Sequence, residues 1–179
     1  MTTYVAMLRG VNVSGRNRLA MDDLRAVVEA AGGRDVRTYV QSGNAVFRST
    51  RPPAGVVATL APALEGAVGH PVAVLLRHAT EMETVMTQNP FLRRGEDPRS
   101  LHVTFLATAP SPAVARPTAS APSAGDDEFV VTGRDVYLFC PDGYGRTKLS
   151  NTFFEKRFAT EATTRNWRTV VALVELAQA

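Results

Sequence analysis

The sequence has little cysteine: of its 179 residues, only Cys140 carries a thiol. A lone cysteine excludes an intrachain disulfide and a cysteine-rich metal site. The three histidines, His70, His78 and His102, share no spacing typical of metal ligands. We therefore expect no bound metal and a fold that is held together by packing alone.

Long hydrophobic runs are also missing. No stretch approaches the roughly 18 consecutive apolar residues that a membrane-spanning helix requires. The first residues, Met1–Val5, contain no basic segment followed by an apolar run, as a signal peptide would. These absences predict a cytoplasmic protein with no membrane partner.

Lysine is scarce, since Lys148 and Lys156 are the only two, and no basic run of five to eight residues occurs. The formal net charge is nevertheless +3, carried mostly by arginine. A basic balance favours anionic partners. Abundant arginine and alanine also arise from genomic base composition, which is the simpler explanation here. The charge alone therefore does not indicate a dedicated surface for nucleic acid.

Apolar residues, by contrast, make up 45% of the chain, enough for one sizeable core or two small ones. Apolar spacing in the first half predicts strands and helices in the order of a split βαβ fold. The expected elements are a strand over 4–8, a helix over 21–31, strands over 36–40 and 45–47, a helix over 52–68 and a strand over 72–76. This βαββαβ order is ferredoxin-like and places both helices on one face of a four-stranded sheet.

The second half has a less regular pattern. The expected elements are a short helix capped by Thr80 with Glu83 in a capping box, a strand over 101–107, a loop or short helix over 110–123, a hairpin over 129–139 and helices over 148–158 and 166–177, the last capped by Thr164. This order is an incomplete version of the first half, without its last strand and with an added C-terminal helix. We therefore predict an α+β protein with two ferredoxin-like subdomains, at 1–78 and 79–179.

Five segments together resemble a known bacterial family. They are LRGVNVSG at 8–15, VRTYVQSGNAVF at 36–47, NPF at 89–91, TKLSN at 147–151 and ATTRNWRTV at 162–170. The chain is similar over almost its whole length to the family catalogued as domain of unknown function 1697. The resemblance implies two α+β subdomains related to the ferredoxin-like fold. It implies no established activity, substrate, cofactor or catalytic residue.

The glycine-bearing loop over 9–18 is the first candidate site. Gly10 and Gly15 have P-loop spacing, but Arg16 and Asn17 stand where lysine and serine or threonine belong, so a Walker motif is rejected. A generic anion cradle is still compatible with its backbone amides and arginines. Asp22 and Asp23 argue against it, because these acids already occupy the first turn of the predicted helix. The alternative is a solvated loop whose glycines serve only the turn. The candidate binding residues here are Arg9, Gly10, Asn12, Ser14, Gly15 and Arg16.

Three further segments contain candidate residues, each with a structural alternative that we favour. The first is a polar turn whose side chains can form hydrogen bonds with the edge of a base or with an amide, or with the backbone of the turn itself. The second is a Gly-x-Gly loop that lacks the third glycine of a dinucleotide fingerprint but places a lysine near a predicted helix start. The third surrounds Trp167, which can stack a base or pack in the core. The candidates are Gln41, Ser42 and Asn44, then Arg146 and Lys148, then Arg165 and Asn166.

These observations favour a binding module for a small anionic, phosphorylated or nucleotide-like ligand, with Arg9, Asn44 and Lys148 at a shared rim. One alternative is an enzyme that acts on a small phosphorylated metabolite and uses Lys148. Another is an RNA- or DNA-binding protein that uses an open sheet face, although the aromatic signature of RNA-recognition motifs is lacking. No cofactor is expected, and the sequence leaves the oligomeric state open.

Overall fold

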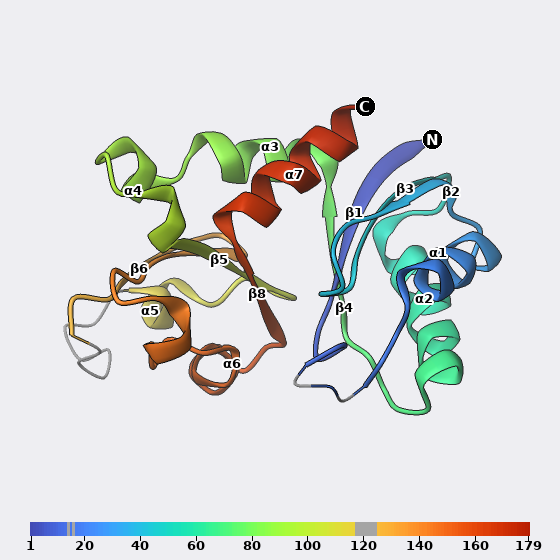
Figure 1. Cartoon of the computed structure of the whole chain (residues 1–179), viewed down its shortest axis with the longest axis horizontal. Coiled ribbons are helices and arrows are strands. Elements are labelled where there is room, and N and C mark those ends of the chain that lie inside the picture. The colour runs from blue at the N-terminus through green and yellow to red at the C-terminus, as the bar shows by residue number, and fades with distance from the viewer. Residues whose placement is uncertain (14, 16, 117–124) are drawn as a thin grey trace. The chain divides into compact units, whose positions relative to one another are not determined.

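The structure of the chain is a computed structural model that describes residues 1–13, 15, 17–116 and 125–179 (Figure 1). By its internal contacts the chain forms two compact units. The first unit contains Met1–Thr84 and Val171–Ala179, and the second contains Val85–Val170. Each unit has a four-stranded antiparallel sheet with helices, which confirms the predicted α+β class. The predicted subdomain boundary after His78 stays a prediction.

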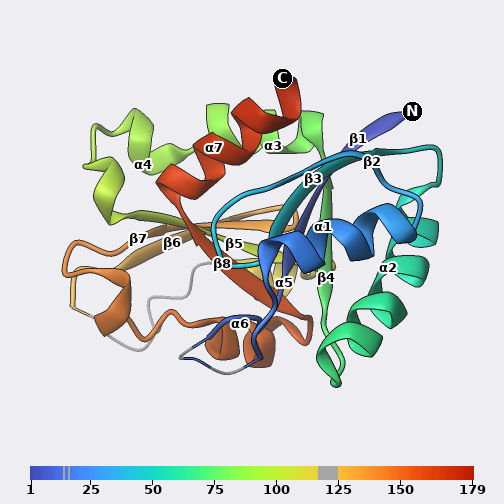
Figure 2. The same cartoon turned by 45° about the vertical axis from the view of Figure 1, so that its right-hand side comes forward.

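The first unit confirms the predicted βαββαβ order. Its elements are β1 (Thr2–Leu8), α1 (Met21–Ala30), β2 (Arg34–Thr38), β3 (Asn44–Ser49), α2 (Pro53–Val68) and β4 (Val74–His78). The strands are arranged in the order β2-β3-β1-β4, and all neighbours are antiparallel. Both helices cover one face of this sheet (Figure 1, Figure 2).

The alternation of side chains along β1 explains why α1 and α2 pack on one face of the first sheet. Tyr4, Ala6 and Leu8 point to the same side and belong to a buried cluster with Leu24 of α1 and Leu60 of α2. Burial of a large apolar side chain stabilises a fold by roughly 1.5–3 kcal/mol. The predicted helix periodicity and the buried face therefore agree.

The second unit is built around another four-stranded sheet. After α3 (Ala79–Thr87) come α4 (Pro90–Arg93), η1 (Pro98–Ser100), β5 (Leu101–Leu106), α5 (Pro112–Ala115), β6 (Glu128–Thr132), β7 (Asp135–Phe139), η2 (Tyr144–Arg146), α6 (Asn151–Phe158), β8 (Ala162–Asn166) and α7 (Trp167–Gln178). The strand order is β6-β7-β5-β8. The helices α3 and α7 each contribute residues to both units.

The expectation that this sheet lacks its last strand is wrong, because β8 pairs with β5 over Ala162–Asn166. The segment is rich in threonine and has only one apolar residue, so hydrophobic periodicity did not reveal it. Its alternation is nevertheless that of a strand. Ala162 belongs to the core cluster beside α6, whereas the alternate positions Thr163 and Arg165 are buried and polar.

Three predicted helix starts are also corrected. α3 begins before Thr80, and the Glu81 carboxylate accepts a hydrogen bond from the His78 amide at 2.7 Å. α6 begins at Asn151 rather than Lys148, because the Ser150 hydroxyl accepts a hydrogen bond from the Phe153 amide.

The third correction concerns the last helix, whose start is capped by Asn166 instead of Thr164. The Asn166 side-chain oxygen accepts a hydrogen bond from the Thr169 amide at 2.8 Å. Thr164 lies inside β8. Trp167 is buried at the start of α7, as its place on the apolar stripe predicted.

The segment over 110–123 contains the short helix α5, while residues 117–124 lie outside the described part of the chain. None of the helices formed by the described residues has both the length and the apolar character needed to span a bilayer.

Candidate ligand-binding loops

The β1–α1 loop leaves the first sheet between two strands. The Leu8 amide donates a hydrogen bond to the Gly43 carbonyl at 2.9 Å, and the Arg9 amide donates one to the Ala73 carbonyl at 3.0 Å. Gly43 precedes β3 and Ala73 precedes β4. The first loop therefore starts at the sheet end, flanked by the segments that enter both neighbouring strands.

Asn12 fixes the conformation of this loop. Its side-chain nitrogen donates to the Leu19 carbonyl at 2.8 Å and to the Gln41 carbonyl at 2.6 Å, and its side-chain oxygen accepts from the Leu19 amide at 2.8 Å. The residue has a φ of +55°, a left-handed conformation that asparagine tolerates better than most residues. Two predicted site segments, the loop over 9–18 and the turn at Gln41, are therefore brought together.

Gly43 makes this contact close. Its φ is +75°, and a Cβ placed on it would overlap Cγ2 of Val11 and lie 3.0 Å from Cβ of Leu8. Any side chain at this position would push the β2–β3 turn away from the β1–α1 loop. Glycine is therefore required here both by conformation and by space.

Asn44 is fully buried, and its side-chain amide forms hydrogen bonds within the β2–β3 turn. Its side-chain nitrogen donates to the Tyr39 carbonyl at 3.0 Å and to the Ser42 hydroxyl at 2.8 Å. The polar groups of this turn therefore hydrogen-bond to one another, which is the alternative that we favoured from the sequence. Gln41 and Ser42, the other candidates in this turn, are exposed.

Several side chains of the first site face solvent. Arg18 and Gly15 are exposed, whereas Arg9 and Gly10 are half-buried; Ser14 and Arg16 lie outside the described residues. Two apolar side chains are also exposed, Val13 at 55% and Val40 at 49%. Val40 has a φ of +47°, which is strained for a β-branched residue.

The predicted residues of the second unit lie on two segments. Arg146 ends the short helix η2, and Lys148 lies in the segment between η2 and α6; both are exposed. Because α6 starts three residues after Lys148, the lysine is not at a helix N-terminus.

A histidine that sequence reasoning did not select links η2 to β8. His102 stacks on Tyr144 of η2, with ring centroids 4.7 Å apart, and pairs across the β5–β8 ladder with Asn166. Its Nδ1 is buried and has no hydrogen-bond partner among the described residues. Burial lowers the pKa of His102, an effect that a backbone hydrogen bond with Ser100 opposes. No spacing rule points to this residue, because strand pairing and stacking place it.

Arg165 is buried on the opposite face of β8. Its guanidinium donates to the Thr163 hydroxyl at 2.8 Å and to the Thr164 carbonyl at 3.0 Å. Burial lowers the pKa of Arg165 to about 10, while Tyr144 acts in the opposite direction. Such a buried arginine suits a structural role better than contact with a diffusing ligand.

A chain of hydroxyls lies within the second unit. Thr164 donates to the Asn151 side-chain oxygen at 2.7 Å, so the hydroxyl of Thr104, 2.7 Å from that of Thr164, acts as its donor. The Cys140 thiol of this unit is buried, and burial raises its pKa to about 11, so the protonated thiol predominates at neutral pH.

The predicted residues thus fall into two sets, each described within its own unit. The first unit joins the loop over 9–18 to the turn at Gln41, and the second contains Arg146, Lys148, Arg165 and Asn166, of which Asn166 pairs with His102 across β5 and β8. Within the described part of the chain, no group of three or more histidine, cysteine or acidic side chains is placed to hold a metal ion. The shared rim of Arg9, Asn44 and Lys148 stays a prediction.

Two antiparallel four-stranded sheets, each with helices and with the ferredoxin-like strand order, define a two-unit α+β protein. Residues 1–137 match the family model described as "Protein of unknown function (DUF1697)", and the chain belongs to this family.

The fold is similar to that of a solved structure, the conserved bacterial protein SP0830 from Streptococcus pneumoniae. That match has a TM-score of 0.75 at 20% sequence identity and covers 98% of both chains. At this identity the likeness shows the fold alone. A comparison with curated proteins gives no significant match.

Proposed function

We propose that the protein is a binding module for a phosphorylated or nucleotide-like ligand, held by the β1–α1 loop and the β2–β3 turn of the first unit. The observation that carries this proposal is the joining of these two segments by Asn12. The loop that carries Arg9, Val13 and Arg18 is thereby held against the turn that follows Val40.

The arginines of the β1–α1 loop support the binding of a phosphate group. Arg18 is exposed and Arg9 is half-buried at the start of the loop, where its backbone is fixed by the sheet. Guanidinium groups are well suited to phosphate because they donate hydrogen bonds in a planar fork. A pre-formed loop also binds with a smaller loss of conformational entropy than a loose one.

The exposed valines support the binding of the base or sugar of the ligand. Val13 follows Asn12 directly, and Val40 precedes Gln41, so the two flank the contact between these residues. Strained backbone, as at Val40, is concentrated at functional sites in proteins. An apolar surface beside arginines is suited to a base or sugar with an attached phosphate.

The proposal is tested by thermal shift with a panel of nucleotides and sugar phosphates, followed by calorimetric titration of each compound that stabilises the protein. A ligand at one hundred times its Kd stabilises the folded state by about 2.7 kcal/mol, which is readily seen as a rise in Tm. We expect Arg18→Gln to weaken the selected compound about tenfold, because one charge-assisted hydrogen bond is lost.

Arg25→Gln is the matched control, because Arg25 is an exposed arginine on α1 outside the loop. It should leave the affinity unchanged, and neither variant should alter the Tm of the ligand-free protein. The proposal fails if no compound of the panel binds, or if both variants lose affinity equally. Salt-sensitive retention on heparin without any small-molecule binding would instead support nucleic acid.

A further inference from the structure

A β-bulge interrupts the pairing of β2 with β3. Arg34 pairs with Arg48 and Arg37 pairs with Val46, so two residues of β2 stand opposite Phe47 alone. Asp35, within the bulge, has a φ of +53°. Bulges re-aim side chains and are frequent next to functional sites. Here the bulge brings the side chain of Arg37 to the face that Val46 shares with Arg48.

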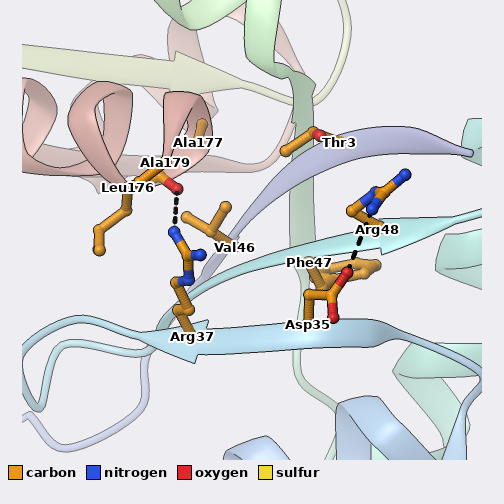
Figure 3. A pocket seen from close by; sticks show the side chains of 9 residues that line it. All are labelled: Thr3, Asp35, Arg37, Val46, Phe47, Arg48, Leu176, Ala177 and Ala179. Atoms are coloured by element: carbon orange, nitrogen blue, oxygen red, sulfur yellow. Dashed lines mark hydrogen bonds and ion pairs between the residues drawn. The ribbon is translucent and has the colours of Figure 1, made fainter.

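A cavity of about 180 Å³ lies at this place, entirely within the first unit (Figure 3). Its polar lining comes from Arg37, Arg48, Asp35 and Thr3, and its apolar lining includes Val46 and the last turn of α7. Pockets for drug-sized ligands have volumes of roughly 300–1,000 Å³. The cavity is therefore suited to a small ion or a short organic molecule rather than a whole nucleotide.

Arg37 lines this cavity with a long cationic side chain. One of its guanidinium nitrogens donates a hydrogen bond to the Leu176 carbonyl at 3.1 Å, and Figure 3 shows the side chain rising from β2 toward the end of α7. No further hydrogen bond or ion pair of this guanidinium occurs among the described residues. A guanidinium has five N–H donors, so most of those on this half-buried side chain are available to a ligand.

The charges around the cavity are unbalanced. Arg34 stands directly opposite Arg48 across the ladder, an arrangement in which like charges destabilise a sheet. Asp35 offsets them in part, through an ion pair with Arg48 at 3.3 Å between half-exposed side chains. Arg37 and Arg48, with Arg34 beside them on the ladder, still outnumber Asp35 and the carboxylate of Ala179, which also lines the cavity, and a bound anion would relieve the remaining repulsion.

We infer that this cavity is a binding site for a small oxyanion, a phosphate or carboxylate group held by Arg37 and Arg48. The site is independent of the loop site proposed above. Thr3 lines the cavity, and Leu8 is the last residue of β1 before the β1–α1 loop. At about 3.3 Å per residue of strand, these two residues lie about 16 Å apart along β1.

The test is a titration of the full chain with sodium phosphate, and separately with sodium acetate, at constant ionic strength and followed by ¹H–¹⁵N NMR. We expect saturable shifts of the Arg37, Val46 and Ala177 amides. Arg37→Gln and Arg48→Gln should each weaken this response about tenfold. Asp35→Asn should strengthen it roughly threefold, because a competing carboxylate is removed.

Arg25→Gln is again the control and should leave the response unchanged. If Arg37→Gln does not fold, Arg48→Gln and Asp35→Asn decide the question. Absence of saturable shifts at these amides with both anions overturns the inference, as does an equal response in wild type, Arg48→Gln and Asp35→Asn. Shifts confined to the β1–α1 loop would also overturn it while leaving the loop proposal intact.

Discussion

The two units share one backbone plan. Their strand orders, β2-β3-β1-β4 and β6-β7-β5-β8, correspond strand for strand along the chain. The amide of Leu8 donates to the residue that precedes β3, and the amide of Leu106 donates in the same way to Arg134, which precedes β7. The amides of Arg9 and Ala107 likewise donate to the residues that precede β4 and β8. The second unit is therefore a complete counterpart of the first.

The correspondence extends to a buried charge. Val5 pairs with Arg77 in the first unit, and Val103 pairs with Arg165 in the second. Both arginines are buried, and each donates to the carbonyl of the residue before it, at 3.1 Å in Arg77 and 3.0 Å in Arg165. Such a repeated detail is not required by the ferredoxin-like fold. It indicates that both units follow one template at the level of side chains.

The differences lie in what covers the sheets. The first crossover contains a 10-residue helix, α1, whereas its counterpart α5 has four residues. Where the first unit has the apolar Ala6 beside Leu76, the second has the hydroxyl pair of Thr104 and Thr164. The first unit thus combines an apolar sheet face with a longer, pinned loop, and that loop is where we place the ligand.

The largest expected effect concerns the turn that precedes the third strand of each unit. We predict that Gly43→Ala lowers the free energy of unfolding by about 3 kcal/mol, since left-handed strain and a steric overlap add. Gly133→Ala should cost only about 1 kcal/mol, because Gly133 has a φ of +59° but open space around its Cβ position. Urea denaturation followed by circular dichroism measures both. Equal losses would show that the close contact at Gly43 is not a constraint.

A smaller effect is expected for the hydroxyl pair of the second unit. We predict that Thr164→Val lowers the free energy of unfolding by about 1.5 kcal/mol, because the buried Thr104 and the half-buried Asn151 both lose this hydrogen-bond partner. Adding Thr104→Val should cost less than the sum of the two single losses, since one orphaned partner is removed as well. A double-mutant cycle measures this coupling, and strict additivity would contradict it.

The smallest effect tests a buried phenol of the second unit. The Tyr137 hydroxyl donates to the Val85 carbonyl at 3.2 Å, so Tyr137→Phe should cost about 1 kcal/mol at neutral pH. Burial raises the pKa of Tyr137 to about 12 from an ordinary value of 10.0. The unfolded chain therefore loses this proton first, and the contribution of Tyr137 to stability falls as the pH rises from about 10 to about 12.

The stability difference between wild type and Tyr137→Phe should consequently shrink over this pH range. Urea titrations of both proteins at increasing pH measure it, and the shared Cys140 contribution cancels in the comparison. A difference that stays constant with pH would show that the phenol is accessible to water in the folded state.

Much of the first unit could be predicted because its signals are local. The stripe of Leu24 and Val28 gave α1, and Pro53 and Gly69 delimited α2. β8 was missed because its burial depends on β5, a partner distant in sequence. The contact of Asn12 with Gln41 and the stacking of His102 on Tyr144 have the same origin. No spacing rule reports such contacts, since only the folded sheet creates them.

The sharing of α7 between the units has a consequence for synthesis on the ribosome. The first unit includes Val171–Ala179, and Arg37 contacts Leu176 within it. At about 5–20 residues per second, translation of residues 85–170 takes about 4 to 17 seconds. During that interval the first unit has been synthesised without Val171–Ala179, so Arg37 still lacks its Leu176 partner.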